Sequence, residues 1–327
     1  MSMRILVLGG GGREHAMVQA LATGARVGEP VTLFCAPGNA GIAAQADCLP
    51  TAGCDVDQVQ SWVRQHGIDL VIPGGEAWLA AGVADRLRSV AIPCVGPTAA
   101  AARLESSKVF ARTLAAWLGV PGPRFRCVYG ERDLSHALSD FDAVPVLKAD
   151  GLAAGKGVLI CGTREEAVQE FTEMLRNNKF GHAGTKVVIE EFLSGIEISV
   201  FAVTDGTHYQ LLPSAKDYKR IGEGDTGLNT GGMGAISPVP FANATFLKKV
   251  ETRIVQPLLM QLAKEGIVYK GFLFIGLMNV NGDPKVIEFN CRLGDPETEV
   301  VIPRIETDII DILEGIANNT IHEVPVK

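Results

Sequence analysis

The chain has 327 residues and a formal net charge of −7 at pH 7. This negative charge, with Lys and Arg spread along the chain, argues against broad nucleic-acid binding, which favours a basic face. No apolar stretch approaches the roughly 20 residues of a membrane-spanning helix, and the apolar run at residues 5–8 is too short for a signal peptide. With 47% hydrophobic and 20% charged residues, the composition is typical of a soluble globular enzyme of two or three folding units.

The seven cysteines are odd in number, and none belongs to a CxxC pair. We therefore expect neither a zinc site nor a disulfide scaffold. Most of them stand among apolar neighbours, where a thiol behaves as a small hydrophobe. A reducing, cytoplasmic location follows as the expectation.

The first hundred residues alternate short apolar runs with helical patterns. We expect strands at residues 4–8, 31–36, 69–73 and 92–95, and helices at residues 14–23, 57–65 and 79–89. Such alternation predicts a parallel sheet with helices on both faces. Ligands of such folds gather where loops leave the carboxyl ends of the strands.

From about residue 120 the rhythm changes. Strands are expected at residues 144–148, 157–161, 186–192, 196–204, 271–280 and 284–292, and helices at residues 164–177 and 244–265. The first two strands are joined by a glycine-rich loop without a helix. This half of the chain therefore reads as α+β with antiparallel strands.

The first candidate motif follows the first strand and runs from Gly9 to His15, with four successive glycines. Glycines there would let backbone N–H groups approach an anion at a helix N-terminus. A dinucleotide fingerprint fails at two points, because Glu14 stands where the last glycine is needed and no acidic residue ends the second strand. A small phosphate-bearing molecule fits better than NAD, and a bare turn is the alternative. A second turn cluster, residues 37–41, ends the next strand and allows the same two interpretations.

The second motif is the stretch from Lys148 to Gly157, which is not a Walker A loop because its glycine spacing differs and a strand follows it. A glycine-rich hairpin that carries lysines can fold over phosphates as a flap, excluding water and supplying donors and positive charge. A simple connection is the alternative.

The third motif is Glu288-Phe289-Asn290-Cys291-Arg292. Alternate residues of a strand share a face, so Glu288, Asn290 and Arg292 should lie on one side, with Ile287, Phe289 and Cys291 toward the core. A carboxylate and an amide oxygen are hard ligands that suit Mg²⁺ on a substrate phosphate, and Arg292 could pair with phosphate. A solvated face with a salt bridge is the alternative.

Two further stretches are polar. The first is a group of acids at a strand end, Glu190 and Glu191 followed by Phe192, with Glu197 nearby. An adenine amino group and ribose hydroxyls, or simply solvent, would supply the hydrogen-bond donors that these carboxylates need. Residues 216–234 are charged and dense in glycine. A loop of that length is usually functional, as an anion-recognising segment, or disordered.

Taken together, these stretches resemble the glycinamide ribonucleotide synthetase (phosphoribosylamine–glycine ligase) family of the ATP-grasp class. The segments that carry the resemblance are GGGREHA, PGNAG, LKADGLAAGKGV, IEEFLSGIE, DTGLNTGGMGA and VIEFNCRLGDPE, in the family's order from Arg4 to about Glu314. The resemblance implies an α/β N-terminal parallel-sheet domain of pre-ATP-grasp, Rossmann-like type, followed by an α+β ATP-grasp fold with antiparallel sheets. The implied boundaries are residues 1–105 and 106–327, with 122–192 as the flap subdomain.

The resemblance also implies a reaction. ATP, with Mg²⁺ or Mn²⁺, would phosphorylate the glycine carboxylate, and the amine of 5-phosphoribosylamine would displace phosphate from glycyl phosphate. No nucleic acid or membrane partner is implied, and we expect a monomer.

Residue by residue, the family's site maps onto this chain in four groups. The metal ligands are Glu288 and Asn290. The ATP-binding residues are Lys108, Lys148, Gly151, Gly155, Lys156, Gly157, Glu190, Glu191, Phe192 and Glu197. The phosphoribosylamine side comprises Gly11, Arg13, Glu14, Asn39 and Glu76. The region where glycine and the transferred phosphate meet comprises the substrate-binding residue Arg220 and the catalytic residues Asp217, Lys219, Arg292 and Asp295.

The sequence departs from the family in three places. The family commonly has G-P-E-x-P-L where residues 74–79 read GGEAWL, and D-H-K-R where Tyr218 stands. Family members usually continue for about another hundred residues as a C-terminal domain, which this chain does not include. The missing C-terminal segment motivates one rival hypothesis, a chain that binds nucleotide but is catalytically incomplete. A second rival, a Rossmann oxidoreductase, rests on residues Gly9 to Gly12 alone.

Overall fold

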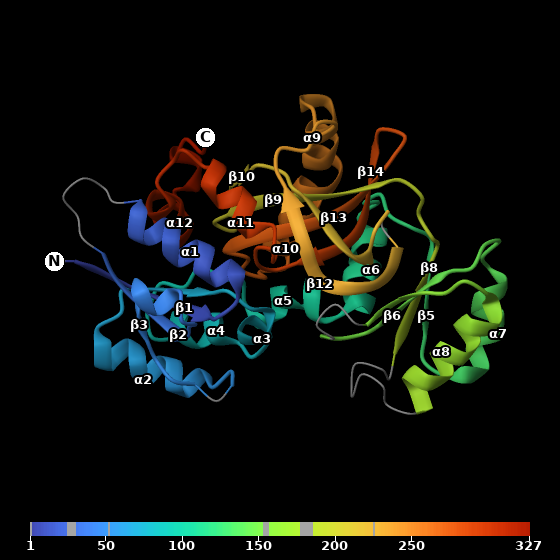
Figure 1. Cartoon of the computed structure of the whole chain (residues 1–327), viewed down its shortest axis with the longest axis horizontal. Helices are drawn as coiled ribbons and strands as arrows, with labels where there is room; N and C mark the ends of the chain where they lie inside the picture. Colours follow the sequence, from blue (N-terminus) through green and yellow to red (C-terminus); the bar gives the residue numbers. More distant parts are fainter. Residues whose placement is uncertain (1, 25–30, 52, 153–156, 177–185, 225) are drawn as a thin grey trace.

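The computed structural model describes residues 2–24, 31–51, 53–152, 157–176, 186–224 and 226–327. Three four-stranded sheets follow one another along the long axis of the molecule (Figure 1). A parallel sheet lies at one end, an antiparallel sheet forms the centre, and a second antiparallel sheet covered by two helices forms the other end. This order confirms the predicted sequence of a parallel-sheet part followed by antiparallel sheets.

The parallel sheet has the strand order β3-β2-β1-β4. Its strands are β1 (Met3–Gly9), β2 (Val31–Pro37), β3 (Asp47–Cys48) and β4 (Leu70–Pro73), and its first helices are α1 (Gly12–Thr23) and α2 (Val56–His66). Successive residues of β1 point to opposite faces, so Ile5 and Val7 pack against α1 while Leu6 and Leu8 pack on the α2 side. Both faces are therefore apolar, as a sheet covered on two sides requires.

Two local predictions for this part were wrong. The helix expected at residues 79–89 is two helices, α3 (Glu76–Ala80) and α4 (Val83–Arg88), because Gly82 between them has a left-handed φ of 81°. The strand expected at residues 92–95 is only an isolated bridge between Val71 and Cys94.

Two helices that the sequence patterns did not assign connect the parallel sheet to the rest of the chain. They are α5 (Ala99–Ser106) and α6 (Lys108–Trp117). The Ser107 side chain caps α6 by accepting a hydrogen bond from Phe110 N at 3.2 Å. Both helices pack against the central sheet in one continuous apolar core.

The terminal antiparallel sheet, which we call the flap sheet, has the order β5-β8-β6-β7. Its strands are β5 (Phe125–Val128), β6 (Val146–Ala149), β7 (Val158–Ile160) and β8 (Val187–Glu190), with helices α7 (Glu131–Ser139) and α8 (Arg164–Arg176). Leu147, Val187 and Ile189 face these helices. Lys148 and Glu190 are therefore on the opposite face, because side chains alternate along a strand.

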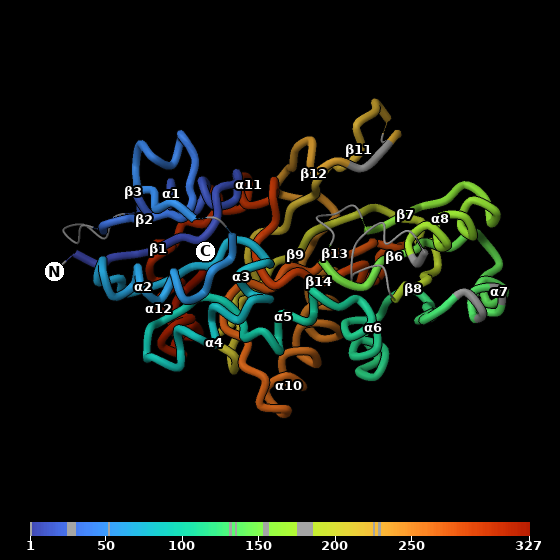
Figure 2. The backbone as a smooth tube through the Cα atoms, turned by 90° about the horizontal axis from the view of Figure 1, so that it is seen from below, coloured from blue at the N-terminus to red at the C-terminus, as the bar shows by residue number. Residues whose placement is uncertain are grey.

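The central sheet has the order β10-β9-β13-β14 and is antiparallel throughout. Its strands are β9 (Ile196–Thr204), β10 (Tyr209–Leu211), β13 (Gly271–Val280) and β14 (Asp283–Asn290). The helix expected at residues 244–265 is present as α9 (Ala244–Val250), one π-helical turn η3 (Glu251–Val255) and α10 (Gln256–Lys264). Figure 2 shows α10 on one side of this sheet, with β11 and β12 on the other.

The polar stretch at residues 216–234, expected to be a loop or disordered, folds as a two-stranded hairpin of β11 (Lys216–Gly222) and β12 (Thr226–Ile236). Its glycines do not prevent pairing, because two register shifts absorb the irregular spacing. The Thr230 hydroxyl donates to Lys219 O at 2.7 Å, which fastens the two strands.

The C-terminal segment returns to the parallel sheet as α11 (Thr298–Val301), the turn η4 (Ile302–Arg304), α12 (Ile309–Asn318) and the turn η5 (Ile321–Glu323). Its isoleucines join α1 in the core on one face of that sheet. No helix in the described part of the chain is both long and apolar enough to cross a membrane.

Candidate functional site

Glu288 and Asn290 stand at the end of β14 with their side chains on the same side. Asn290 Nδ2 is 3.5 Å from Glu288 Oε1, and Arg292 Nη2 is 3.5 Å from Asn290 Oδ1. The predicted common face of these three side chains is therefore present. Rotation about the terminal bond of Asn290 exchanges its oxygen and nitrogen, so either atom can be turned toward Glu288.

The expected alternation on β14 holds only in part. Phe289 and Cys291 are buried in the core beside α10, as predicted. Ile287 does not join that core and is only partly buried, because a β-bulge shifts the register between β13 and β14 at this point. Gly276 lies opposite Glu288, where a Cβ atom would come within 2.9 Å of the Glu288 side chain.

Cations surround the Glu288 carboxylate. Burial opposes its ionisation, but the positive charges of Lys219, Lys148 and Lys108 outweigh burial and lower its pKa to about 2. Lys219 also lies 3.3 Å from Asp217 Oδ2 and 3.7 Å from Glu197 Oε2. The carboxylate is thus ionised at neutral pH, as a metal ligand must be.

Lys148 joins the flap sheet to the central sheet. It is 4% exposed, and its Nζ atom is 2.8 Å from Glu190 Oε2 and donates to Ile287 O at 2.9 Å. Lys148 pairs with Val188, two residues before Glu190 on β8, so both side chains emerge on one face. An ammonium group has three N–H donors, and these two contacts leave one for a ligand.

Arg112 completes this connection, and the motif search missed it. Its guanidinium donates to Glu190 Oε1 at 2.5 Å and to Glu190 Oε2 at 2.9 Å, and also to Val286 O at 2.7 Å and to Ile287 O. Arg112 follows Lys108 by four residues, the spacing that puts two side chains on one face of a helix. This spacing is the sequence feature that could have indicated that Arg112 lies on the same side of the helix as Lys108.

Arg292 connects the end of β14 to the parallel-sheet part. Its Nη2 atom is 2.7 Å from Glu105 Oε1, and its Nε atom is 3.3 Å from Glu76 Oε2. Burial opposes the charge, but these two carboxylates raise the pKa of Arg292, which stays protonated. Glu105 also accepts a hydrogen bond from Cys291 N at 2.8 Å. Sequence analysis assigned no role to Glu105.

The start of the flap loop, which follows β6, is hydrogen-bonded to the start of α6. Asp150 Oδ1 accepts from Ser107 Oγ and from Val109 N, both at 3.0 Å, and Lys108 Nζ donates to Gly151 O at 3.3 Å. The loop ends at Gly157, whose carbonyl accepts from Ala149 N at 2.8 Å. Gly155 and Lys156 lie outside the described residues.

The remaining predicted residues differ in exposure and position. Phe192 is 47% exposed. Glu191 Oε2 accepts a hydrogen bond from Arg124 N at 3.1 Å. The Glu190 carboxylate is instead enclosed, at 2% exposure, with both oxygens occupied by basic side chains. Arg220 is on β11, in register with Asn229 of β12.

The glycine-rich turn after β1 encloses a carboxylate of this chain. Glu14 Oε2 accepts from Gly11 N at 2.7 Å, and Glu14 Oε1 accepts from Arg13 Nε at 2.7 Å. A Cβ atom at Gly74 would stand 2.2 Å from Glu14 Oε1. These glycines therefore make room for Glu14, the third residue of α1, whose carboxylate accepts the backbone N–H of the N-cap residue Gly11.

Arg13, Asn39 and Asp295 tie this turn to its surroundings. Arg13 Nη1 donates to Leu293 O at 3.1 Å, and Arg13 N donates to Asp295 Oδ2 at 3.3 Å. Asn39 Nδ2 donates to Gly10 O at 3.1 Å, and its Oδ1 accepts from Gly41 N at 2.8 Å. The loops after β1 and β2 and the segment after β14 thus meet, which brings the predicted phosphoribosylamine residues to the Arg292 side of the site.

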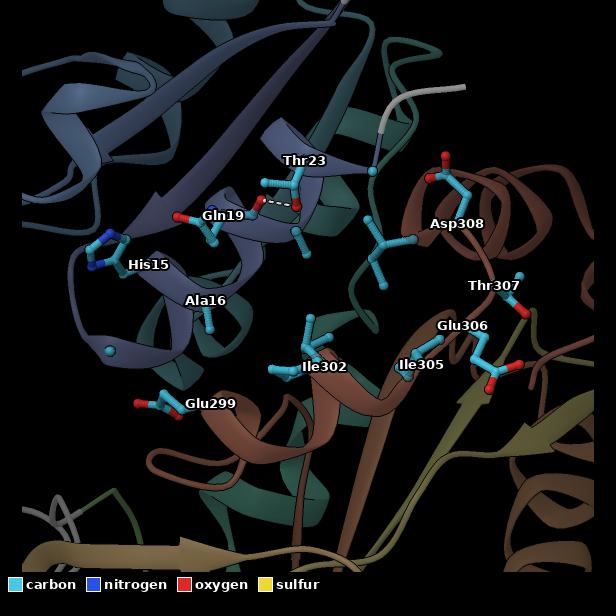
Figure 3. A pocket seen from close by; sticks show the side chains of 15 residues that line it. His15, Ala16, Gln19, Thr23, Glu299, Ile302, Ile305, Glu306, Thr307 and Asp308 are labelled. Atoms are coloured by element: carbon cyan, nitrogen blue, oxygen red, sulfur yellow. Dashed lines mark hydrogen bonds between the residues drawn. The ribbon is translucent and has the colours of Figure 1, made fainter. Parts of the chain in front are cut away.

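A larger cavity, of about 630 Å³, lies between α1 and the segment from Glu299 to Ile309, shown in Figure 3. Its lining includes the carboxylates of Glu299, Glu306 and Asp308, and none of the described residues that line it is Lys or Arg. Because phosphate recognition needs positive charge, the small polar pocket lined by Glu197, Asp217, Lys219 and Glu288 is the better candidate site. Gly12 and His15 of the first glycine-rich motif line the larger cavity, but none of the residues assigned to the metal, to ATP or to the substrates does.

A parallel-sheet part followed by two antiparallel sheets, with lysines and an acid–amide pair between those sheets, defines an ATP-grasp fold. The biotin carboxylase of Campylobacter jejuni shares this architecture with a TM-score of 0.74 over 97% of this chain and 71% of that chain. At 17% identity the likeness concerns the fold alone.

Two family models match successive segments of the chain. The phosphoribosylglycinamide synthetase N domain matches residues 3–105, and the ATP-grasp (A) domain of the same synthetase matches residues 106–298. The chain belongs to the phosphoribosylglycinamide synthetase family.

Relatives named phosphoribosylamine–glycine ligase are similar over almost the whole chain. The one from Chlorobaculum tepidum is 43% identical over 332 aligned residues, which cover 99% of this chain and 77% of the relative. The one from Caldanaerobacter subterraneus is 41% identical and covers 96% of this chain and 74% of the relative. The crystal structure of the Thermotoga maritima ligase superposes with a TM-score of 0.84 at 34% identity, over 97% of this chain and 76% of that chain.

Proposed function

We propose that the chain ligates glycine to 5-phosphoribosylamine, with ATP converted to ADP and phosphate, to form the amide glycinamide ribonucleotide. The observation that carries the proposal is the 43% identity to a phosphoribosylamine–glycine ligase across 99% of the chain. The arrangement around Glu288 supports it, because a carboxylate becomes a good electrophile only after phosphorylation at a site whose cations compensate the phosphate charge.

In the first step, a glycine carboxylate oxygen attacks the γ-phosphorus of ATP, giving glycyl phosphate and ADP. In the second step, the amine of phosphoribosylamine attacks the acyl carbon and phosphate leaves with the bonding electrons. The amine loses a proton as the amide forms, so the products are the amide, ADP, phosphate and one proton.

Glu288 and Asn290 fit a divalent cation. The pair offers an ionised carboxylate and an amide oxygen close together, and the nearby lysines can hold phosphates beside the ion. When bound, Mg²⁺ or Mn²⁺ would neutralise phosphate charge at this point. We propose Mg²⁺ in preference to Mn²⁺ because Mg²⁺ commonly accompanies substrate phosphates with few protein ligands.

Lys148 and Lys108 are proposed to hold the phosphates of ATP. Lys148 has one N–H left after its contacts with Glu190 and Ile287 O, and those contacts fix where that N–H points. Glu190, together with Arg112, would therefore position Lys148 rather than touch the nucleotide with its carboxylate. Glu191, Phe192 and Glu197 would form the adenine and ribose side, and the loop that contains Gly151, Gly155, Lys156 and Gly157 would cover the phosphates.

Arg292 and Lys219 are proposed to hold the glycine carboxylate and the transferred phosphate. Arg292 is fixed by two carboxylates, Glu105 and Glu76, which pre-organise its guanidinium. Asp217 and Glu297 are the buried acids near Lys219, and Asp217 would orient its ammonium group.

The phosphoribosylamine is proposed to lie on the Arg13 side of Arg292. Gly11, Arg13, Glu14 and Asn39 would line that side of the site. Asp295 accepts from Arg13 N and Glu76 pairs with Arg292, so both would lie beside it. Arg220, on the β11–β12 hairpin, would approach from the other side of the glycine site.

The family matches change over at residues 105 and 106. We propose residues 1–105 and 106–327 as domains, with residues 122–192 as the flap, and a monomeric, cytoplasmic enzyme. Size-exclusion chromatography with light scattering tests the monomer, for which one chain mass is expected.

Phosphate release tests the reaction. The rate is measured with ATP and glycine, with ATP and phosphoribosylamine, and with all three together. Rapid release is expected only with all three. Release that ignores either substrate, or calorimetric binding of ATP without release in the complete mixture, would reject the ligase.

A further inference from the structure

Three side chains that no part of the proposed reaction uses gather on the side of the central sheet near the C-terminal segment. Asp205 and His208 belong to the turn between β9 and β10, and His322 belongs to η5. One potential ligand atom from each of the three lies within 4.8 Å of those of the other two. The rings of His208 and His322 are 4.1 Å apart between centroids.

We propose that Asp205, His208 and His322 form a surface site for a divalent transition-metal ion, best suited to Zn²⁺, that ties η5 to the β9–β10 turn. Imidazole and carboxylate are the ligands that Zn²⁺ takes, with water completing a tetrahedron.

The Asp205 carboxylate is pre-organised to give one oxygen to an ion. Its Oδ1 atom accepts backbone N–H bonds from Thr207 at 2.8 Å and from His208 at 2.7 Å. Its Oδ2 atom is hydrogen-bonded to His208 Nδ1 at 3.3 Å, a contact that an ion bound by both atoms would replace. Zinc bonds of about 2.0–2.2 Å in a tetrahedron put neighbouring ligand atoms roughly 3.3 Å apart, so this edge already has the spacing of an occupied site.

The two histidines can complete the site. Their side chains are 45% and 46% exposed, whereas that of Asp205 is fully buried. An ion can therefore arrive from solvent, and an exposed His322 ring can rotate to close the remaining gap.

The backbones that carry the ligands are held together without an ion. Gln210 Nε2 donates to Ile321 O and to Val324 O, both at 2.5 Å. The His208 carbonyl accepts from Thr204 Oγ1 at 2.7 Å. Because both segments are fixed before binding, an ion would bind without paying for a large rearrangement.

The test is Zn²⁺ binding by the whole chain, freed of metal and supplied with excess Mg²⁺ to fill the Glu288 site. Calorimetry is expected to show one Zn²⁺ per chain, and the melting temperature is expected to rise with Zn²⁺ concentration. His208→Ala and His322→Ala should each weaken Zn²⁺ binding by at least about tenfold, because losing even an outer-shell partner of a zinc ligand costs that much.

His136→Ala is the matched control, since His136 is an exposed histidine of α7 in the flap, and it should bind Zn²⁺ as the wild type does. Protection of His208 and His322 from diethyl pyrocarbonate by Zn²⁺, read by mass spectrometry, tests the unmodified chain should a variant fail to fold. Unchanged Zn²⁺ affinity in both alanine variants, loss only in Glu288→Gln, or no protection of the two rings would overturn the site.

Discussion

Glu288 is a buried carboxylate whose neighbours are cations. Lys219, Lys148 and Lys108 keep it ionised down to a pKa of about 2. The negative charge of this carboxylate in turn offsets the repulsion between the positive charges of the three lysines. A divalent ion and a polyphosphate would enter this balance together, the ion beside Glu288 and the phosphates beside the lysines.

Glu288→Gln removes the charge and keeps the shape. We expect kcat/KM for phosphate release to fall by at least about 100-fold, because an electrostatic contact made in the transition state is lost, while thermal unfolding stays a single cooperative transition. Asp283→Asn is the control on the same strand, as Asp283 is exposed and pairs with Lys249 and Arg253. Near-normal turnover in Glu288→Gln would refute the metal assignment.

Glu299 predicts a pH effect on stability. Burial, with the nearby Asp295 charge, raises the pKa of Glu299 to about 7. The folded chain thus holds this proton more tightly than the unfolded chain, whose value is the ordinary 4.5. The resulting stability is present below pH 4.5 and is lost as the pH rises through 7.

Glu299→Gln should remove that loss. Between pH 5 and pH 8 the free energy of unfolding of the wild type should fall by on the order of 1 kcal/mol more than that of the variant. Urea titrations at the two pH values measure both. Equal changes in the two proteins would show that Glu299 does not carry the effect.

At the scale of elements, α6 couples helix capping to the flap. Its first turn carries Lys108. In that turn the Ser107 hydroxyl accepts from Phe110 N, and the Asp150 carboxylate accepts from Val109 N and from the Ser107 hydroxyl. The start of the flap loop is therefore fixed to the helix that presents a phosphate-binding lysine.

Ser107→Ala should lower the free energy of unfolding by about 1 kcal/mol, the usual value of an N-cap. It should also raise KM for ATP, because Asp150 at the start of the flap loop loses one of its two hydrogen bonds to the start of α6. Urea unfolding and initial rates measure the two effects. Ser139→Ala, at the end of α7, is the control, since its hydroxyl only bonds the His136 carbonyl. A stability loss with unchanged KM would separate capping from the flap.

The elements that the sequence predicted well are continuous apolar runs. The short runs of β1 and β2 and the long run of β13 gave strands whose ends agree within a few residues. Prediction failed where backbone geometry decides. Gly82 breaks a helix whose apolar pattern continues across it, and paired β11 and β12 look like a polar loop because their register shifts hide the alternation.

For the site, the sequence indicated the residue types but not their partners. Glu288 and Asn290 follow from a strand period of two. That Arg112 holds Glu190, or that Glu105 holds Arg292, depends on packing between segments far apart in the chain. The glycine turn after β1 shows the same limit, because its close neighbour is Glu14 of this chain, which no local rule distinguishes from a ligand phosphate.

At the scale of the whole molecule, the Glu105–Arg292 pair joins the two halves of the chain. Glu105 is 8% exposed, lies in the last turn of α5 and accepts from Cys291 N, while Arg292 follows β14. Breaking a buried ion pair by removing one partner costs about 3–5 kcal/mol, because the other charge stays buried. Glu105→Ala should therefore lower the free energy of unfolding by about that amount and reduce turnover through misplacement of Arg292.

Glu105→Gln separates charge from hydrogen bonding, since its amide oxygen can still accept from Cys291 N, so its loss should be smaller than that of Glu105→Ala. Glu165→Ala is the control, because Glu165 is exposed in the first turn of α8 and should change stability by less than about 1 kcal/mol. Urea unfolding followed by two probes, one in each half, gives the energies. If both Glu105 variants changed the free energy of unfolding as little as Glu165→Ala, the pair would not hold the halves together. Glu76 and the backbone would then be the groups that position Arg292.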